Sequence, residues 1–544
     1  MIEPCLSNFA LHIKHRAEKI PDGTAYIFPR GSISYRDLER ESSTLARGLF
    51  HSGVRKGVRV AFLVPPSREF FILAFALLKL GTIPILIDPG IGLRQIRRCL
   101  ETAGPEVFIG IPRAHLGRLL FGWGKKTVRL KITVGKTGIW GGTNFEALRA
   151  AGQSAPLMET IAMDPDEPAA VVFTSGSTGP SKGAIYTHRI LHTQVELLQK
   201  HHGIAEGEVS LATFPLFALF DPAMGVTSVI PKMDFTRPGN VNPENIIRPV
   251  REYSVTHMFG SPALLKRVAS DGDFAQGNLD SLKRVLSAGA PISPKILRSF
   301  LARLPEDAKI YTPYGATEAL PVATISHEAI LGGTELMTSR GSGVCVGRPF
   351  PELFVGIIRI EDEPIEHWSE ELLLPQNEIG EIVVSGDNVS RGYDRNPGAD
   401  RLSKIEGACG VIYHRTGDLG YLDPDGRLWF CGRKSHRVST SGGILYPVVC
   451  EGIFNRHPAV YRSALVGVGP ARAKTPVLCV ELEPAAKGVN QTRLREELLQ
   501  IGAESPITRA IRTILFHPSF PVDIRHNAKI YREKLALWAE RKMR

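Results

Sequence analysis

Short apolar runs alternate with longer amphipathic stretches through the first four hundred residues of the chain. RVAFLVP (59–65), IPILIDP (83–89) and EVFIGI (106–111) have the length of buried strands, and stretches with a helical repeat lie between such runs. Gly and Pro mark the ends of the runs, for example at Pro65, Gly81 and Pro89. This alternation predicts an α/β fold of layered, largely parallel sheets crossed by helices.

The pattern changes in the last third of the chain. From Gly380 onward, shorter strand-like pieces follow one another, separated by turn signals such as DPDG (423–426). A basic, polar stretch, KSHRVSTSGG (434–443), then precedes a compact unit of strands and helices. We therefore expect two domains, residues 1–433 and residues 434–544.

Composition narrows the class of protein. Apolar residues make up 43% of the 544 positions and charged residues 22%, which is typical of a soluble globular protein. The seven cysteines are odd in number and include no CxxC pair, so we expect a reduced, cytoplasmic setting without a zinc site or a disulfide framework. The N-terminus lacks the pattern of a signal peptide, and the longest apolar run, Phe70 to Leu78, is too short to span a bilayer.

Much of the net charge of +11 lies in one segment, RAHLGRLLFGWGKKTVRLK (113–131). Its six Lys and Arg residues are interleaved with Leu119, Leu120, Phe121 and Trp123, and no acidic residue intervenes. One interpretation is a solvated helix edge and turn. The other is a surface peripheral to the membrane, or one that meets an acidic partner. Nucleic acid is not expected, because no nucleic-acid-binding motif is present.

A loop rich in Gly, Ser and Thr, VVFTSGSTGPSKGAIYTH (171–188), has the composition of a phosphate-binding loop. Glycines let backbone N–H groups approach an anion, hydroxyls donate hydrogen bonds, and Lys182 adds one positive charge. The spacing differs from that of a Walker A motif, because Lys182 is followed by Gly183 rather than Ser or Thr. The flanking apolar runs predict a tight strand–loop–strand hairpin instead of a flexible linker.

Four further stretches occur in order with this loop: SAGAP (287–291), YGATE (314–318), RTGDLGYLDPDGRLWFCGRK (415–434) and NAKIYREKL (527–535). With them the chain resembles the adenylate-forming superfamily of acyl-CoA synthetases, luciferases and peptide-synthetase adenylation domains over nearly its whole length. The resemblance implies a large N-terminal domain that includes a distorted β-barrel, and a small, mobile α+β C-terminal domain. It also implies ATP and Mg²⁺ as cofactors.

The resemblance assigns roles residue by residue. It places the phosphates of ATP near Thr317 and the loop residues Thr174, Ser175, Gly176, Ser177, Thr178, Gly179 and Lys182. Glu318 is expected to hold Mg²⁺, since a hard cation prefers an oxygen ligand. The resemblance places adenine against Tyr314 and near Gly289, Ala290, Pro291 and Gly315, and places the ribose against Asp418 and Arg433. Lys529, from the C-terminal domain, is expected to reach the carboxylate and α-phosphate.

Three motifs depart from those of the acyl-CoA synthetases. Ala218 stands where those enzymes usually have His, the hinge reads Gly-Arg-Lys-Ser-His from Gly432 to His436, and Ala528 replaces the usual Gly before the C-terminal Lys. These changes leave adenylation intact but argue against thioester formation with CoA. Asp221 and His436 are the two candidates for a base in a different second step.

The variant motifs resemble the β-lactone synthetases of bacterial long-chain olefin biosynthesis. Such enzymes adenylate a 2-alkyl-3-hydroxy fatty acid, whose own hydroxyl then displaces AMP, and other enzymes of olefin biosynthesis are conceivable partners. A tethered hydroxyl is already at high effective concentration, so no second substrate is required. A long-chain acyl-CoA synthetase and a non-catalytic acyl or nucleotide sensor are the alternatives, although the presence of Lys182, Glu318 and Lys529 argues against a sensor.

Overall fold

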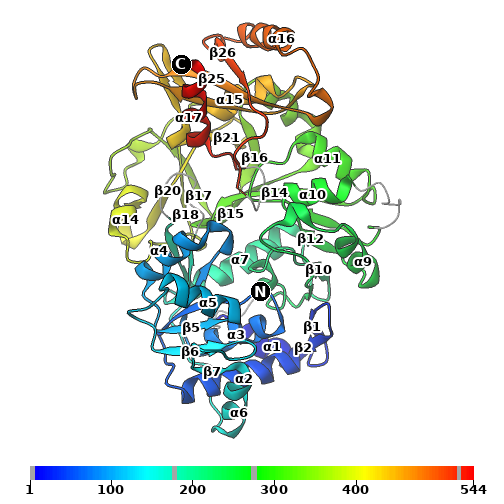
Figure 1. Cartoon of the computed structure of the whole chain (residues 1–544), viewed down its shortest axis with the longest axis vertical. Coiled ribbons are helices and arrows are strands. Elements are labelled where there is room, and N and C mark those ends of the chain that lie inside the picture. Colours follow the sequence, from blue (N-terminus) through cyan, green and yellow to red (C-terminus); the bar gives the residue numbers. More distant parts are fainter. Residues whose placement is uncertain (1–6, 174–180, 271–278, 524–528) are drawn as a thin grey trace.

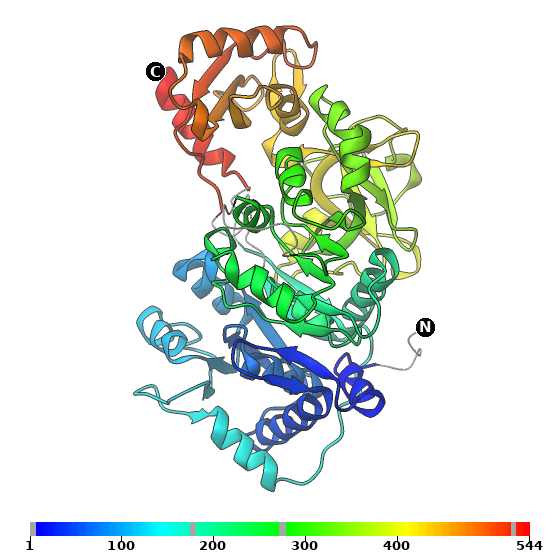
Figure 2. The ribbon, with the colours of Figure 1, turned by 90° about the vertical axis from the view of Figure 1, so that its right-hand side faces the viewer.

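The computed structural model describes the chain except for residues 1–6, 174–180, 271–278 and 524–528. Figures 1 and 2 show an elongated molecule with N-terminal α/β layers at one end and the C-terminal unit at the other. Among the described residues, no helix combines the length and hydropathy that a bilayer crossing requires. The cysteines within the described ranges are all free thiols.

A seven-stranded sheet forms the first layer. Its strands, in spatial order, are β7 (Thr143–Asn144), β6 (Leu130–Thr133), β5 (Val107–Gly110), β3 (Arg59–Leu63), β4 (Ile83–Ile87), β8 (Pro168–Phe173) and β9 (Gly183–Thr187). All neighbouring pairs are parallel except β8 and β9. The helices of this region are α2 (Tyr35–His51), α3 (Arg68–Lys79), α4 (Leu93–Ala103), α5 (Pro112–Phe121) and α6 (Phe145–Ser154). The alternation in the sequence therefore predicted this layer correctly.

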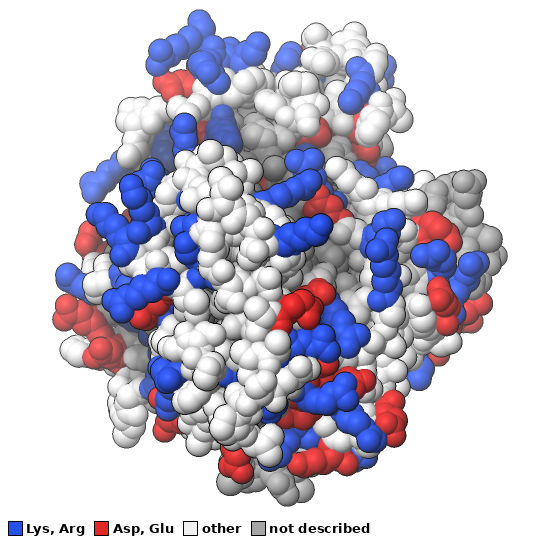
Figure 3. Space-filling model, turned by 60° about the horizontal axis from the view of Figure 1, so that its bottom comes forward, with Lys and Arg blue, Asp and Glu red and all other residues white. Residues whose placement is uncertain are grey.

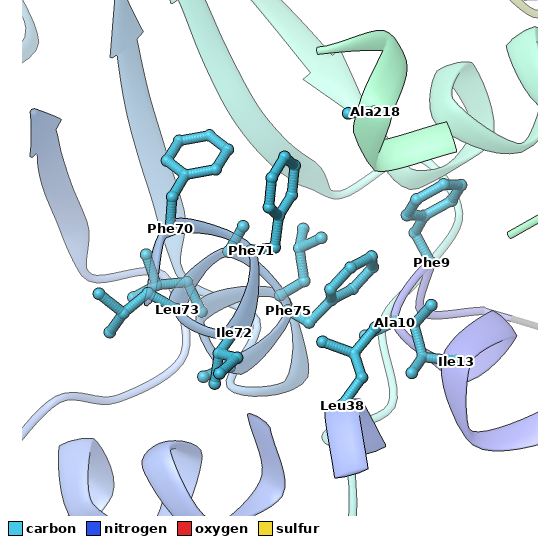
Figure 4. Close-up of a cluster of buried hydrophobic side chains, with 14 of the residues drawn as sticks. Phe9, Ala10, Ile13, Leu38, Phe70, Phe71, Ile72, Leu73, Phe75 and Ala218 are labelled. Atoms are coloured by element: carbon cyan, nitrogen blue, oxygen red, sulfur yellow. The ribbon is translucent and has the colours of Figure 1, made fainter. Parts of the chain in front are cut away.

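Helix α3 is the central element of the N-terminal core. Ser67 caps it by accepting a hydrogen bond from the N–H of Phe70, and every residue from Phe70 to Lys79 is buried. Figure 4 shows its side chains pointing outward on several sides, with Phe75 directed toward Phe9. A helix that is apolar all round belongs in a protein core or a membrane, and here the surrounding elements cover it.

The second layer is a fourteen-stranded sheet. Its path runs through β2 (Ser32–Ser34), β1 (Thr24–Ile27), β11 (Thr227–Val229), β10 (Val209–Leu211), β12 (His257–Phe259), β13 (Arg284–Leu286), β14 (Lys309–Ala316), β15 (Ala319–Ser326), β16 (Val344–Pro349), β21 (Leu428–Arg433), β20 (Ile412–Leu422), β18 (Gly380–Ser385) and β17 (Phe354–Ile358), with β19 (Lys404–Glu406) beside β20. From β1 to β14 the neighbours are parallel, and from β14 onward they are antiparallel. The strands expected in a distorted barrel form this antiparallel half.

Nine helices of the described residues accompany this sheet and its connections. They are α1 (Leu11–Lys19), α7 (His188–His202), α8 (Phe217–Phe220), α9 (Glu244–Glu252), α10 (Pro262–Ala269), α11 (Pro294–Leu301), α12 (His327–Ala329), α13 (Glu335–Ser339) and α14 (Pro397–Ser403). Several begin at a Ser or Thr cap, as α7 does at Thr187, whose side chain accepts a hydrogen bond from the N–H of Ile190.

The C-terminal unit has sheets of its own. One pairs β22 (Val438–Thr440) with β23 (Gly443–Leu445), and the other contains β24 (Val460–Val468), β25 (Thr475–Leu482) and β26 (Thr513–Phe516). Its helices are α15 (Pro447–Phe454), α16 (Gln491–Ala503) and α17 (Arg532–Met543). Among the described residues, no strand pairing joins these sheets to the large sheet. This separation is consistent with a boundary near Lys434, but the exact division into two domains stays a prediction.

Candidate functional site

The turn between β14 and β15 places the YGATE residues where the large sheet changes from parallel to antiparallel. The pairing of the two strands is irregular between Tyr314 and Ala316. A Cβ atom on Gly315 would lie 2.5 Å from the carbonyl oxygen of Ala319, so the close backbone approach requires glycine there. This local geometry holds Tyr314 and Glu318 at one end of the hairpin.

Tyr314, Asp418 and Arg433 come together from β14 and from the paired strands β20 and β21 of the same sheet. The Tyr314 hydroxyl donates to Asp418 Oδ2 at 2.7 Å, and Arg433 Nε lies 3.0 Å from Asp418 Oδ1 as an ion pair without hydrogen-bond alignment. Asp418 and Arg433 face each other across β20 and β21. Burial raises the pKa of Asp418, and the Arg433 guanidinium opposes that shift. The carboxylate is therefore a buried, oriented acceptor that could receive hydroxyl donors.

Glu318 lies beside a tyrosine from a distant part of the chain. The Tyr393 hydroxyl donates to Glu318 Oε1 at 2.6 Å. The neighbouring Thr317 accepts, through its carbonyl oxygen, a hydrogen bond of 2.8 Å from the Tyr186 hydroxyl. Within the described residues, no cluster of three or more His, Cys, Asp or Glu side chains is arranged to hold a metal. A lone carboxylate fits Mg²⁺, because this ion usually takes one or two protein carboxylates together with substrate phosphates and water.

The expected hairpin around the phosphate loop is present. Strands β8 and β9 pair antiparallel, with Phe173 opposite Gly183. Thr174, Ser175, Gly176, Ser177, Thr178 and Gly179 lie outside the described residues, so their contacts are not described. Lys182 follows the loop, and its Nζ lies 5.0 Å from the centroid of the Tyr393 ring. Tyr393 therefore links Lys182 to Glu318.

Lys529, from the C-terminal unit, lies near enough to Arg433, Asp418 and Glu318 for their charges to act on its ammonium. Its N–H donates to Asp523 Oδ1 at 3.2 Å, and the N–H of Asp523 donates back to the Lys529 carbonyl oxygen at 3.0 Å. Burial and the Arg433 charge lower the pKa of the Lys529 ammonium, whereas Asp418 and Glu318 raise it. These influences place Lys529 in the electrostatic field of the N-terminal site residues. Ala528, the residue before it, lies outside the described ranges.

The SAGAP residues follow the carboxyl end of β13. The backbone of this loop turns at Gly289, where φ is +94°, a value that favours glycine. Gly289 and Pro291 are exposed, and Ala290 is half-buried. Ser287 anchors the loop by donating its N–H to the carbonyl oxygen of Tyr311 at 2.8 Å. The loop thus follows the strand beside β14, and its contact with adenine stays a prediction.

The two candidate bases lie in different surroundings. Asp221 is buried at the end of α8, where it accepts a hydrogen bond of 2.6 Å from the Ser228 hydroxyl, and burial raises its pKa to about 6. His436 lies in the hinge, 3.3 Å from Glu533 Oε1. Burial and the nearby charges of Arg532, Arg433 and Lys529 lower the pKa of His436 to about 3, so its imidazole is neutral near pH 7. Neither arrangement by itself assigns the base.

An apolar cavity adjoins this site and was not predicted from the sequence. The space around it, counting its open mouth, is about 770 Å³. Its walls come from α3, β4, β8, the start of α7, the residues 214–220 around α8, and Phe9 and Phe62. Tyr186 and Gln194 also line it, and Gln194 donates to the Leu320 carbonyl oxygen at 2.9 Å. The cavity wall is therefore tied to the residues next to Glu318.

Sequence reasoning also missed Tyr393 and Lys404. Tyr393 lies in RGYDRNPG (391–398), where the Gly, Asn and Pro residues signal a turn but nothing indicates a contact with Glu318. Lys404 sits in a polar stretch that reads as surface. Only the folding of residues 390–404 against β9 and the β14–β15 turn brings these two side chains to the site.

Comparison with known proteins agrees with this geometry. Two curated relatives named olefin beta-lactone synthetase match along nearly the whole chain. The protein from Stenotrophomonas maltophilia (strain K279a) is 45% identical, covering 99% of each chain, and the one from Xanthomonas campestris pv. campestris is 44% identical, covering 98% of each.

Solved structures share the fold at lower identity. Amide bond synthetase McbA from Marinactinospora thermotolerans superposes with a TM-score of 0.79 at 22% identity, covering 98% of this chain and 99% of McbA. ATP-bound MatB from Rhodopseudomonas palustris gives a TM-score of 0.80 at 20% identity, covering 99% of this chain and 100% of MatB. Residues 13–394 match the AMP-binding enzyme family. This match covers most of the chain, which therefore belongs to the AMP-binding enzyme family.

Proposed function

We propose that this chain uses ATP to convert a 2-alkyl-3-hydroxy long-chain fatty acid into a β-lactone, with release of AMP and pyrophosphate. The observation that carries the product assignment is the 45% identity, along 99% of both chains, to an olefin beta-lactone synthetase. Activation of a carboxylate as an acyl-adenylate follows from the family and from the grouping of Tyr314, Asp418 and Lys529.

The apolar cavity supports a long-chain substrate. Its lining is almost entirely aliphatic and aromatic, so burial of an alkyl chain there is favoured by about 0.8 kcal/mol per methylene. Tyr186 lines the cavity and donates to the carbonyl oxygen of Thr317 at 2.8 Å. A chain bound in the cavity would therefore place its carboxyl end toward Thr317 and Glu318.

In the first step, a carboxylate oxygen attacks the α-phosphorus of ATP and pyrophosphate leaves. Lys182 and the loop residues Thr174–Gly179 would bind the departing phosphates, while Lys529 would stabilise charge that develops on the α-phosphate. Asp418 and Arg433 would orient the ribose, and Tyr314 would pack against adenine. Glu318 would hold Mg²⁺, which neutralises phosphate charge when bound.

In the second step, the 3-hydroxyl oxygen attacks the acyl carbonyl carbon, the bond to AMP breaks, and the hydroxyl proton passes to a base. Asp221 and His436 remain the candidates. The pKa of Asp221, raised to about 6, suits a general base, but its carboxylate is bonded to Ser228 and it does not line the cavity. His436 lies in the same charged cluster as Lys529, but its low pKa makes it a weak base.

Hinge contacts support a reaction that needs no thiol channel. Lys434 Nζ lies 3.0 Å from Glu381 Oε2, and Arg437 pairs with Asp362, so two hinge side chains bind the N-terminal part of the chain. Glu381 is also paired with the buried Arg415 at 2.6 Å. This network would hold Lys529 toward the site during both steps.

Product analysis by mass spectrometry tests the proposed function. The purified chain is incubated with ATP, Mg²⁺ and a 2-alkyl-3-hydroxy long-chain acid, with and without CoA. We expect β-lactone at the same rate in both, and only bound adenylate from a plain long-chain fatty acid. CoA-dependent formation of acyl-CoA from the plain fatty acid would instead assign a long-chain acyl-CoA synthetase, and absence of pyrophosphate release would favour a non-catalytic binder.

We further propose that the enzyme meets an anionic membrane surface through the end of α5. The α5 surface consists of exposed Leu116, Leu119, Leu120 and Phe121, bordered by exposed Arg113, Lys125, Lys126 and Arg129. Leu120 is 70% exposed. Apolar side chains beside basic ones suit insertion into the headgroup region of anionic lipids, where each basic residue contributes about 1 kcal/mol.

Two residues of the basic segment do not belong to this surface. Trp123 is buried and stacks on Phe121 with ring centroids 5.9 Å apart. Arg118 is partly buried, with its guanidinium 5.9 Å from the centroid of the Phe108 ring. Basic charge is also spread elsewhere, since Figure 3 shows Lys and Arg bordering a broad uncharged band on one face, with acidic side chains mixed among them lower down. Membrane binding must therefore be tested at the α5 surface itself.

A further inference from the structure

Lys404 is a buried lysine without a direct acidic partner. It begins β19, is 7% exposed, and donates from Nζ to the carbonyl oxygen of Ser390. Among the described residues, no carboxylate oxygen lies within 4.0 Å of its Nζ. Lys79, the other deeply buried lysine, has such a partner, since its Nζ lies 2.5 Å from Glu39 Oε1. Burying an ammonium costs several kcal/mol unless an opposite charge or hydrogen bonds offset the lost hydration. The burial of Lys404 therefore suggests that its charge has a role.

The surroundings of Lys404 point to the phosphate end of the site. Its Nζ lies 5.5 Å from the centroid of the Tyr393 ring, and Lys182 Nζ lies 5.0 Å from the same centroid. A cation within about 6 Å of an aromatic face is attracted to its π electrons. The Tyr393 hydroxyl donates to Glu318 Oε1 at 2.6 Å. The Tyr393 ring thus connects Lys404 with Lys182, which is expected at the phosphates, and with Glu318, which is expected at the metal.

The backbone around Tyr393 fixes this connection. The N–H of Ser390 donates to the Glu318 carbonyl oxygen at 2.8 Å, and the N–H of Asp394 donates to the Gly183 carbonyl oxygen at 2.7 Å. The 390–394 segment is therefore held between the residue after Lys182 and Glu318 itself. Lys404 also anchors the first residue of this segment, because its Nζ donates to the Ser390 carbonyl oxygen.

The charges that face Lys404 are mixed. Burial and the nearby charge of Lys182 lower the pKa of its ammonium, whereas Glu318 and Asp400 raise it, and the pKa is lowered to about 8 in all. Buried His414 also faces Lys404, whose charge contributes to lowering the pKa of that imidazole. Added negative charge at the phosphate site would favour the ammonium, because its desolvation is then compensated.

We propose that Lys404 is a positioning residue for the triphosphate of ATP. Through Tyr393 it holds Lys182 and Glu318 at a fixed separation, and its buried positive charge attracts the phosphates that contact them. This inference rests on the ATP use proposed above, but not on the identity of the acid or of its product.

Nucleotide binding measured by calorimetry tests the proposal without turnover. AMP is the discriminating probe, because it has the adenine and ribose of ATP but lacks the β- and γ-phosphates. For Lys404→Met we expect affinity for MgATP to fall about tenfold. We expect affinity for AMP to stay within about twofold, since contacts at Tyr314 and Asp418 are unchanged. In steady state, KM for ATP should rise more than kcat falls, and Lys404→Arg should restore part of the affinity.

Lys79→Met is the matched control, since it removes a buried lysine far along the chain from the site. It should lower the midpoint of thermal unfolding but leave both nucleotide affinities unchanged. Equal weakening of ATP and AMP binding by Lys404→Met, or no weakening of either, would overturn the proposal.

A second variant keeps the test decisive if Lys404→Met does not fold. Tyr393→Leu removes the ring that faces both lysines, and we expect the same selective loss of ATP affinity. Unchanged ATP affinity in that variant would refute the link through Tyr393. If the parent protein binds ATP but forms no lactone, the proposed product is wrong while this inference stands.

Discussion

Lys529 provides the most direct test at the scale of single residues. Because its ammonium is expected to act on charge that develops during transfer, Lys529→Ala should slow pyrophosphate release by at least about a hundredfold. The dissociation constant for ATP should change by less than about threefold, since adenine and ribose are proposed to bind the N-terminal part of the chain. Lys542→Ala, at the exposed end of α17, is the control and should behave like the parent. Undiminished pyrophosphate release in Lys529→Ala would remove this residue from the mechanism.

Asp221 gives a prediction about pH and stability. Its pKa is raised to about 6 in the folded protein, against about 3.9 in an unfolded chain. The folded state thus binds the proton more tightly than the unfolded chain does. Proton binding at Asp221 therefore stabilises the fold fully below about pH 4, and this stabilisation is lost as pH rises through about 6. Asp221→Asn removes the titration, and Asn can still accept a hydrogen bond from Ser228.

Urea unfolding at pH 4.5 and pH 8 measures this effect. The free energy of unfolding of Asp221→Asn minus that of the parent is measured at each pH. This difference should be about 2 kcal/mol larger at pH 8 than at pH 4.5. Asp307→Asn, on an exposed loop, should show no such difference. Identical pH dependence in Asp221→Asn and the parent would show that the carboxyl group is not perturbed.

At the scale of elements, the α5 surface makes a prediction about lipid binding. Replacing Arg113, Lys125, Lys126 and Arg129 by Gln should weaken binding to vesicles that contain anionic lipid by at least about tenfold. Neutral vesicles should show a smaller change, and Leu120→Ser should weaken both kinds of binding by reducing the inserted apolar area. Co-sedimentation measures these affinities.

The control for the α5 surface changes the same amount of charge elsewhere. Arg472, Lys487, Arg541 and Lys542 are exposed basic residues of the C-terminal unit, and their replacement by Gln should leave vesicle binding nearly unchanged. Equal losses in the two quadruple variants would show that only net charge matters. Unchanged vesicle binding by the α5 variant would favour the interpretation of this segment as a solvated helix edge.

At the scale of the whole molecule, the hinge network should control how well Lys529 reaches the site. Lys434→Met removes the contact with Glu381, whose carboxylate keeps its partner Arg415. We expect adenylate formation to slow by about three- to tenfold, because misplacing a reacting group is costly. ATP affinity should not change, and the comparison of pyrophosphate release with calorimetry separates the two. Full activity in Lys434→Met would mean that other contacts orient the C-terminal unit.

The sequence by itself determined the layered α/β fold, because the alternation of apolar runs and helical repeats is a local property of the chain. It also contains the motifs around Lys182, Glu318, Asp418 and Lys529, whose roles are implied by their resemblance to the adenylate-forming superfamily and stay predictions. The hairpin of β8 and β9 was also predictable from a local pattern, because two short apolar runs flank a loop of turn residues.

Only the tertiary structure decided how these pieces meet. The apolar cavity is assembled from α3, β4, β8 and the residues around α8, and no single segment carries its signal because each apolar face resembles ordinary core. Lys404, Tyr393 and Glu318 form one cluster, although Glu318 and Lys404 are 86 positions apart in the sequence. Trp123 belongs to a segment for which the sequence left a solvated edge and an interfacial surface open, and it is buried in the turn after α5 because it packs into a hydrophobic cluster with residues of β3, β4, β5 and α4. Local patterns specify elements, whereas burial and long-range charge arise only when distant segments pack together.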